Sequence, residues 1–175
     1  MRTSSRGLTL LELLLSLTIL AVLGALTVSA LTIGAKGFMS SRADVETAQR
    51  ARLALTRLTI DLRNLSAITT AQGSSLVFTD KDGTSTTLAH TGTNLTLNGN
   101  LLAEDLATYP AGSTLFAYRR ADGTTAWTIT DNLDLLYEII ITLRLKRPRD
   151  PVAGGVTHIF TATVNPRNTG AANMP

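Results

Sequence analysis

The chain has 175 residues, 44% of them hydrophobic, and its 16 Lys and Arg against 13 Asp and Glu give a formal net charge of +3. It contains no cysteine, which excludes disulfide frameworks and thiolate metal sites. The hydrophobic residues are not evenly spread: 23 residues from Leu13 to Ala35 carry no charge, and the chain beyond them is rich in Thr, Asn and Gly. We therefore expect a small domain attached to an apolar segment.

The apolar N-terminal segment fits either a secretory signal peptide or a membrane span. Arg2 and Arg6 supply a basic start, but the run is longer than the roughly 7 to 15 residues typical of a signal peptide. As a helix, 23 residues are about 34 Å long, enough to cross a hydrocarbon core of about 30 Å. The two arginines outweigh Lys36 on the other side, which predicts a cytoplasmic N-terminus. The alternative, an ordinary secreted protein, would be cut within "TVSALTIGA".

Glu12 is a carboxylate near the start of this apolar run. A charge inside the bilayer costs at least about 2.5 kcal/mol, so it needs a partner or a task. The stretch Gly7-Leu8-Thr9-Leu10-Leu11-Glu12 resembles the class III signal of type IV pilins and type II secretion pseudopilins. Those proteins share a short basic leader, a Gly before the cut, an apolar first residue (usually Phe, here Leu8) and a Glu five residues into the mature chain. The alternative is a plain anchor with Glu12 at the headgroup boundary.

The resemblance implies a processing step and an assembly contact. A prepilin peptidase would cut between Gly7 and Leu8 on the cytoplasmic side, Leu8 would be N-methylated, and the apolar segment would stay on the protein. When subunits pack through these segments, Glu12 would face the α-amino group of a neighbour, because a paired charge is tolerable in low dielectric where a lone one is not. A shifted subunit would leave both charges unpaired, so the pair would also set the axial register.

Residues 36–66 contain no proline and carry apolar residues at three- and four-residue steps: Val45, Ala48, Ala51, Leu55, Leu58, Leu62 and Leu65. This spacing predicts a helix with one apolar face. Because no proline occurs before Pro110, the span and this stripe are predicted to form one helix of about 55 to 60 residues, close to 85 Å long. Gly24, Gly34 and Gly37 are its weak points, either for close helix packing or for unwinding during assembly.

From Ser74 onward the apolar period changes to two, and Thr, β-branched and aromatic residues become common. The segments that read as strands are "SSLVFTD", "TSTTLAH", "NLTLNG", "STLFAYRR", "TAWTIT", "YEIIITLRLK" and "THIFTATV". Asp82-Gly83, Asn98-Gly99 and Asp122-Gly123 predict hairpin turns, where a positive φ is needed. The order predicts an α+β fold in which the long N-terminal helix packs on an antiparallel β-sheet.

This outline resembles the pilin fold, and three stretches narrow the resemblance. "AQRARLALTRLTIDLRNLSAI", "LLAEDLATYPAGSTLFAYRRADG" and "IIITLRLKR" followed by "FTATVNPRN" resemble J-type pseudopilins and PilW-like minor pilins. Glu12 argues against a K-type tip subunit, which typically lacks this carboxylate. The resemblance implies a leader at 1–7, a transmembrane and assembly helix at 8–35, its amphipathic continuation at 36–70, and a β-rich domain outside the cytoplasm at 71–175.

No catalytic motif appears in the sequence. His90 and His158, its two histidines, stand in Thr-rich strand-like segments, and no G-x-S-x-G, H-E-x-x-H or P-loop occurs. Asp80 and Asp82 in "DKDGT" are candidate Ca²⁺ ligands, but the Gly comes too early for an EF-hand loop and no Glu follows at the right distance. The sequence favours a hairpin turn there and predicts neither an enzyme nor a cofactor.

The pI of about 9.7 raises nucleic-acid binding as a second class of function. Removing Arg2 and Arg6 with the leader takes Lys and Arg from 16 to 14 against 13 acids, a net of +1. The remaining candidates have no interleaved aromatic residues to stack bases, so a strand edge guarded by basic residues is favoured: Arg119, Arg120, Arg144, Lys146, Arg147 and Arg149. A DNA-binding minor pilin stays an alternative, as does a single-span adhesin or sensor, which would not need the signal from Gly7 to Glu12.

The sequence thus predicts a minor pilin or pseudopilin, a non-catalytic subunit of a type IV pilus or type II secretion filament that helps to prime assembly near the tip. Its partners would be the prepilin peptidase, other minor and major subunits, and the inner membrane. It would first cross the inner membrane once, with a periplasmic C-terminal domain, and then join a filament at the cell surface.

Overall fold

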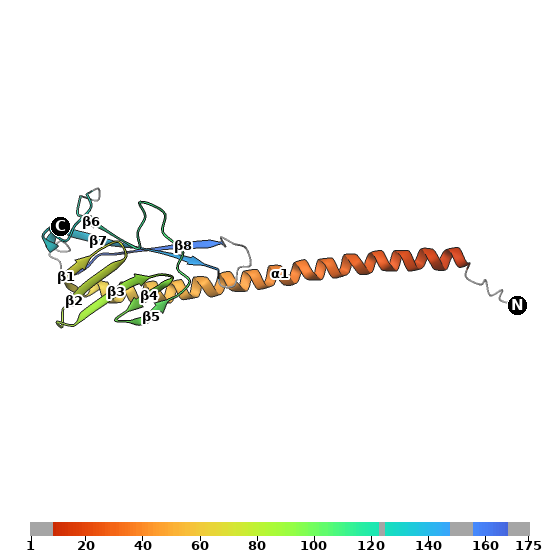
Figure 1. The fold of residues 1–175 in the computed structure, drawn as a ribbon, viewed down its shortest axis with the longest axis horizontal. Helices are drawn as coiled ribbons and strands as arrows, with labels where there is room; N and C mark the ends of the chain where they lie inside the picture. Colours follow the sequence, from red (N-terminus) through yellow and green to blue (C-terminus); the bar gives the residue numbers. More distant parts are fainter. Residues whose placement is uncertain (1–8, 123–124, 148–155, 168–175) are drawn as a thin grey trace. The chain divides into compact units, whose positions relative to one another are not determined.

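The computed structural model describes residues 9–122, 125–147 and 156–167. A single long helix, α1 (Leu10–Arg63), precedes two antiparallel sheets (Figure 1). The first sheet has the order β1-β2-β3-β4-β5 and the bounds β1 (Leu65–Ala71), β2 (Ser75–Asp80), β3 (Ser85–Thr91), β4 (Asn94–Leu97) and β5 (Asn100–Ala103). The second has the order β6-β7-β8, with β6 (Phe116–Arg120), the 3-10 helix η1 (Leu133–Leu135), β7 (Leu136–Lys146) and β8 (Thr157–Val164) in chain order.

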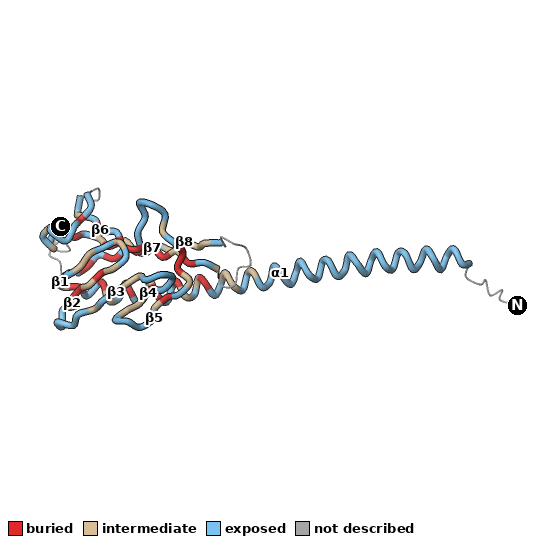
Figure 2. The backbone as a smooth tube through the Cα atoms, viewed as in Figure 1, coloured by how far each residue is buried: buried red, intermediate tan, exposed pale blue. Residues whose placement is uncertain are grey.

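The predicted α+β class is confirmed: a long N-terminal helix packs on antiparallel β-structure. The strands are divided between two sheets, which the sequence did not indicate. The chain also divides into two units between Arg42 and Ala43. Within residues 9–42 every side chain except that of Ser40 is exposed, whereas buried residues occur only in the second unit (Figure 2).

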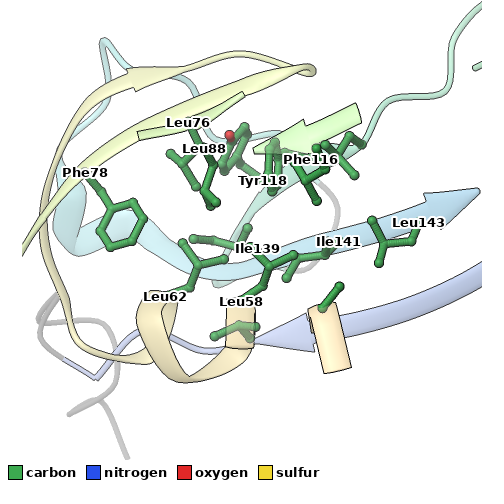
Figure 3. Packing of buried hydrophobic residues seen from close by; sticks show 14 of the residues in the cluster. Leu58, Leu62, Leu76, Phe78, Leu88, Phe116, Tyr118, Ile139, Ile141 and Leu143 are labelled. Atoms are coloured by element: carbon green, nitrogen blue, oxygen red, sulfur yellow. The ribbon is translucent and has the colours of Figure 1, made fainter. Parts of the chain in front are cut away.

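One hydrophobic core unites the second half of α1 with both sheets. Leu58 and Leu62 of α1 are fully buried, and Figure 3 shows their side chains beside Ile139 and Ile141 of β7. The first sheet contributes Leu76, Phe78 and Leu88, and the second adds Phe116, Tyr118 and Leu143. Burial of this apolar area is the main stabilising term of the domain, because each such Leu or Phe contributes roughly 1.5 to 3 kcal/mol.

The buried face of α1 differs from the predicted stripe at both ends. Val45 is 54% exposed, and the buried helix positions are Thr47, Ala51, Ala54, Leu58 and Leu62. A polar Thr replaces Val45 at the first of these positions because its hydroxyl donates to the carbonyl of Ala43 at 2.8 Å and so needs no outside partner. Ala51 and Ala54 follow as buried positions of the same face.

The amphipathic helix ends at Arg63, not at residue 70, so the predicted 36–70 boundary is wrong. Asn64 closes the last turn through its N–H to the carbonyl of Asp61, and Leu65, predicted as helical, is the first residue of β1. The run Ile68-Thr69-Thr70 is β-branched, which favours a strand, and the Ser66 hydroxyl donates to the carbonyls of Thr79 and Asp80 on the paired strand.

The hairpin signals were informative. Asn98 (φ 51°) and Gly99 (φ 79°) both adopt positive φ between β4 and β5, as a type I′ turn requires, and Gly83 (φ 82°) lies between β2 and β3. Gly123, the second residue of the third predicted turn, lies outside the described residues. Strand β5 itself was missed, because its apolar run is only Leu101 to Ala103.

The segment "TAWTIT" is not a strand, contrary to the prediction. It contributes an isolated bridge between Ala126 and Arg119, and then turns. The turn is held by Asp131, whose carboxylate accepts from the N–H and hydroxyl of Thr128 while its own N–H donates to the Thr128 carbonyl. The Trp127 ring N–H donates to the carbonyl of Asn132. These local bonds compete with the sheet ladder for the backbone.

Residues 105–115 continue the second sheet beyond the short strand β6. Three backbone bonds tie this segment to β7, two of them joining Ala107 N to Arg144 O at 2.7 Å and Thr142 N to Leu115 O at 2.9 Å. The Tyr109 hydroxyl donates to the carbonyl of Thr142 at 2.6 Å, and burial raises the pKa of this phenol. The two sheets also meet where Phe116 N donates to the carbonyl of Gly73 at 3.0 Å.

Candidate assembly segment

The segment that carries the predicted signal begins with a helix cap. The N–H of Glu12 donates to the Thr9 hydroxyl at 3.3 Å, and the N–H groups of Glu12 and Leu13 reach the Thr9 carbonyl at 3.0 and 3.1 Å. Thr9 is therefore the N-cap of α1 and Glu12 occupies the third helical position. Thr-x-x-Glu before an apolar run is the capping-box pattern, which the sequence contained and which sequence reasoning missed.

The Glu12 side chain itself is exposed and forms no ion pair with any described residue. A carboxylate in the first turn is favoured by the positive end of the helix dipole, typically by 0.3 to about 1 kcal/mol. Gly7 and Leu8, the predicted cleavage and methylation residues, lie outside the described part of the chain. The α-amino group that Glu12 is predicted to meet does not exist until the chain is cut before Leu8.

The apolar part of α1 presents its side chains outward. Leu10, Leu20 and Ile33 are 83%, 69% and 71% exposed. The helix is long and apolar enough to cross a membrane by length and composition. These side chains therefore need lipid or other apolar helices around them, since no described residue covers them.

The hydroxyl groups in this segment are satisfied within the helix. Those between Leu10 and Ala35 each donate to a backbone carbonyl three or four residues earlier, at 2.8 or 2.9 Å, and belong to Ser16, Thr18, Thr27, Ser29 and Thr32. An unsatisfied polar group in hydrocarbon would cost several kcal/mol. The segment is thus compatible with a hydrocarbon environment at every position after Glu12.

The three glycines of this region do not interrupt the helix. Gly24, Gly34 and Gly37 all lie within α1, and a Cβ built at any of them would meet nothing within 4 Å. Their small size therefore relieves no contact inside the chain. Both roles suggested by the sequence, close packing against another helix and local unwinding, stay predictions.

The candidate Ca²⁺ residues form the predicted hairpin turn. Asp80 Oδ1 accepts from the N–H groups of Asp82 and Thr84, both at 2.9 Å, and the Asp82 carboxylate is 3.0 Å from the Lys81 ammonium group. Among the described residues no group of three or more His, Asp and Glu side chains is placed to hold a metal ion. The Asp80 oxygen is engaged in shaping the β2–β3 turn.

A charged cluster that sequence reasoning missed joins α1 to the second sheet. Asp44 on α1 accepts two bonds from the Arg147 guanidinium, at 2.8 and 3.0 Å, and its Oδ1 is 3.0 Å from Nε2 of His158 on β8. The sequence places His158 in a Thr-rich strand-like segment, which gave no sign of this contact. Asp44 is 114 residues away in the chain, so no local pattern signalled the contact. The other histidine, His90, makes an edge contact with the ring of Tyr109.

Several basic residues considered for nucleic-acid binding have carboxylate partners. Arg119 lies 3.3 Å from Glu138, and Arg120 pairs with Asp131. The hydrogen bond from Arg120 lowers the pKa of Asp131 to about 2, and the Thr128 backbone N–H adds to the effect. Arg144 and Lys146 form no ion pair with a described residue, and Arg149 lies outside the described part.

Comparison with protein families gives one match. Residues 2–28 match the family described as the prokaryotic N-terminal methylation motif, a range that includes Gly7, Leu8 and Glu12. No curated protein and no solved structure matches the chain. Proteins with this motif are processed by a prepilin peptidase, and pilin-type proteins are generally structural. Together with the exposed apolar helix, the motif supports a membrane-anchored, single-pass subunit of the type IV pilin or pseudopilin kind.

Proposed function

We propose that the chain is a minor pilin or pseudopilin of a type IV pilus or type II secretion filament, that it has no catalytic role, and that it primes assembly near the filament tip. The observation that carries this proposal is the methylation motif at residues 2–28, which runs into the start of α1, where the apolar side chains are exposed and not covered by any described residue. A filament of packed helices would bury those side chains. The resemblance of residues 48–68 to J-type and PilW-like subunits supports the minor role.

In this proposal the chain enters the inner membrane with its N-terminus in the cytoplasm and its C-terminal domain in the periplasm. A prepilin peptidase cuts after Gly7, and the new amine of Leu8 is methylated. Glu12 then pairs with the amine of a neighbouring subunit, so that lateral packing becomes favourable only in the correct axial register. Other minor and major subunits are the partners.

Processing is tested on the native protein. We expect its mature N-terminus to be Leu8, carrying one methyl group, by N-terminal sequencing and mass spectrometry. Replacing Gly7 with a bulkier residue is expected to leave the leader in place, because the peptidase must seat the residue before the cut closely. A mature N-terminus near Ala30 or Ala35 would mean an ordinary secreted protein and would refute the filament role.

Glu12 separates a filament subunit from a plain anchor, provided that its position in the capping-box pattern is controlled for. Glu12→Leu removes both the charge and the capping group, whereas Glu12→Gln keeps a side chain that suits the capping box. If Glu12 only caps the helix, Gln should behave as wild type. If it pairs with an amine, both variants lose the partner charge, and such a loss costs about 3 to 5 kcal/mol, a hundred-fold or more in assembly.

The measurement is the amount of each variant recovered in sheared filaments, normalised to the amount in the membrane. We expect both variants to be cleaved after Gly7 and held in the membrane, but depleted from filaments at least a hundred-fold. Recovery of Glu12→Leu at the wild-type level would leave two explanations. Either this subunit occupies the end of the filament, with no subunit ahead of it, or Glu12 has no role in assembly. Crosslinking to a subunit on the distal side would decide between them.

A further inference from the structure

The outer strand of the second sheet, β8, has an open edge. The sheet order β6-β7-β8 leaves β8 with β7 as its single strand neighbour. The pairing runs without a register shift over eight residues, from Thr157 opposite Lys146 to Val164 opposite Ile139. A regular strand of this length presents an uninterrupted row of backbone groups on its outer side.

The hydrogen-bond phase identifies which groups point outward. Arg147 N donates to Val156 O at 3.0 Å, so this pair is a hydrogen-bonded one and the even-numbered residues of β8 face β7. The bonds on the other side of β7 are consistent with this phase. The even-numbered residues Thr142 and Lys146 of β7 donate their N–H groups away from β8, to Leu115 O and Asp105 O. The odd-numbered residues of β8 therefore direct their N–H and C=O groups away from the sheet: Thr157, Ile159, Thr161 and Thr163.

Neither the N–H nor the C=O groups that point outward form a hydrogen bond with the part of the chain that the structure describes. The side chains beside them are also uncovered: Ile159 is 59% exposed, and Thr161 and Thr163 are exposed. Only an extended backbone offers acceptors and donors with the two-residue spacing of this row.

The other sheet edges carry features that discourage pairing. The edge of β6 is covered, since Arg120 N donates to Thr125 O and Trp127 N donates to Tyr118 O. Strand β1 is interrupted by two register shifts, and β5 is only four residues long. Strand β8, with the sequence "THIFTATV", has no Lys, Arg, Asp, Glu or Pro and no bulge. Natural proteins usually protect a strand of this kind.

The charge beside this edge indicates what would occupy it. Arg144 and Lys146 lie on β7 opposite Ile159 and Thr157, on the sheet face away from the core. Neither has an ion-pair partner among the described residues, and the Nε of Arg144 is buried without a hydrogen bond. A strand added beyond β8 would lie two strand spacings, about 10 Å, from β7. A Lys or Arg side chain on β7 and a Glu side chain on the added strand can together span this distance.

We propose that the open edge of β8 receives a β-strand from a neighbouring subunit of the filament, one that carries acidic residues beside Arg144 and Lys146. The inference rests on the proposed filament role and names a second contact for it, in the domain and not in the apolar helix. The added strand satisfies the outward N–H and C=O groups of β8, and its carboxylates give the pairing its register.

A second copy of this chain fits the edge less well. Contacts of Asp44 with His158 and of Arg63 O with Arg167 N show that β8 runs parallel to the part of α1 beside it. Antiparallel pairing of two β8 strands would therefore reverse the direction of α1 from one copy to the next. Subunits that enter a filament from the same membrane share one direction.

The first test removes one outward N–H. Thr161→Pro deletes a donor that β7 does not use, and Thr161→Val keeps the N–H with a side chain of similar shape. We expect Thr161→Pro to be recovered in sheared filaments at least tenfold less than wild type, with Thr161→Val unchanged. Equal recovery of all three would overturn the inference. Absence of the wild-type chain from filaments would overturn the proposed function and this inference with it.

A second measurement needs no variant and so does not depend on folding of the proline chain. Hydrogen exchange at single amides is compared between the detergent-dispersed chain and the filament. We expect the amides of Ile159, Thr161 and Thr163 to exchange at least tenfold more slowly in the filament, while those of Phe160 and Ala162, already bonded to β7, serve as internal controls. Unchanged exchange at the odd positions would overturn the proposal.

The charge and the identity of the occupant are tested separately. Lys146→Glu should lower recovery in filaments and Lys146→Arg should not. Because the chain has no cysteine, Thr161→Cys introduces a unique thiol. A disulfide-linked dimer of this variant in the membrane would assign the edge to a second copy and overturn the proposal. Retention of monomer under the same oxidation, with the exchange protection above, supports a different subunit.

Discussion

Residues 10–42 and residues 43–63 belong to the same helix, yet their relation to their surroundings is opposite. In the first region large apolar side chains such as Leu23 are more than half exposed, while in the second Leu58 and Leu62 are fully buried. Within the first region, residues 13–35 carry no charge, and their hydroxyl groups bond to carbonyls of the same helix. The second region has one buried face and charged residues elsewhere. The comparison teaches that the first region is completed by its environment and the second by its own chain.

The largest difference should appear between two leucine truncations, one in each region. Leu58→Ala is expected to lower the free energy of unfolding of the domain by about 2 to 5 kcal/mol, because it leaves a cavity in a packed core. Leu23→Ala, which removes an exposed side chain, should leave that value unchanged. Both are measured by denaturant unfolding of the full chain in detergent. Leu53→Ala, on the exposed face of the same helix, is the control, expected within about 0.5 kcal/mol of wild type.

Glycines give a second matched pair. A Cβ at Gly73 would lie 2.5 Å from Thr114 Cγ2 and 2.8 Å from Thr114 Cβ, so Gly73→Ala should destabilise the domain by about 1 to 3 kcal/mol. Gly34→Ala meets nothing within 4 Å and should raise helix stability by up to about 1 kcal/mol. Thermal unfolding followed by circular dichroism reports both. Equal stability of Gly73→Ala and wild type would show that the two sheets separate easily at this point.

The cluster that ties α1 to the second sheet should have a smaller effect. Asp44→Ala leaves Arg147 and His158 without their shared acceptor, and because all three side chains are partly exposed we expect a loss of about 1 to 2 kcal/mol. Glu46→Ala removes the partner of an exposed i,i+4 pair with Arg50 and should cost less than about 0.5 kcal/mol. If the two variants unfold alike, the cluster does not fasten the helix to the sheet.

The smallest effect concerns acid pH. Asp131 has its pKa lowered from 3.8 to about 2, first by the hydrogen bond from Arg120. Its carboxylate form is therefore favoured by folding, so its contribution is present above pH 4 and is lost as the pH falls through 2. We expect Arg120→Gln to flatten this part of the stability profile and to leave the profile above pH 5 parallel to wild type. If the stability of Arg120→Gln falls with acid pH as that of wild type does, the Arg120–Asp131 pair does not contribute to the stability of the domain.

Several elements were readable because their signals are local. The apolar run and Glu12, the long helix without proline, and strands such as β2, β7 and β8 follow from periodicity, and Asn98-Gly99 follows from turn chemistry. Errors arose where another part of the chain decides. The spacing places Val45 on the buried face, but it is 54% exposed, and Thr47 is the first buried position of α1.

The end of the helix shows the same limit. Leu65 continues the apolar spacing of Leu58 and Leu62, so the pattern alone extends the helix past its true end. Pairing with β2 and the Ser66 hydroxyl bonds favour a strand instead. In the segment from Thr125 to Thr130 the reverse holds. Thr125 and Trp127 bond to β6, but the strand-like residues that follow form a turn, because the Asp131 carboxylate accepts from the N–H of Thr128.

The sequence by itself determined the membrane-compatible helix, the motif around Gly7 and Glu12, and the α+β class, since each depends on composition or spacing within a few turns or strands. Only the tertiary structure decided that the strands form two sheets, that Asp44 meets Arg147 and His158, and that β8 has β7 as its single strand neighbour among the described residues. These features join residues about a hundred positions apart or depend on which strand lies outermost. The periodicity of apolar residues does not predict long-range contacts or the order of strands in a sheet, because it shows which face of an element is apolar and not which element covers that face.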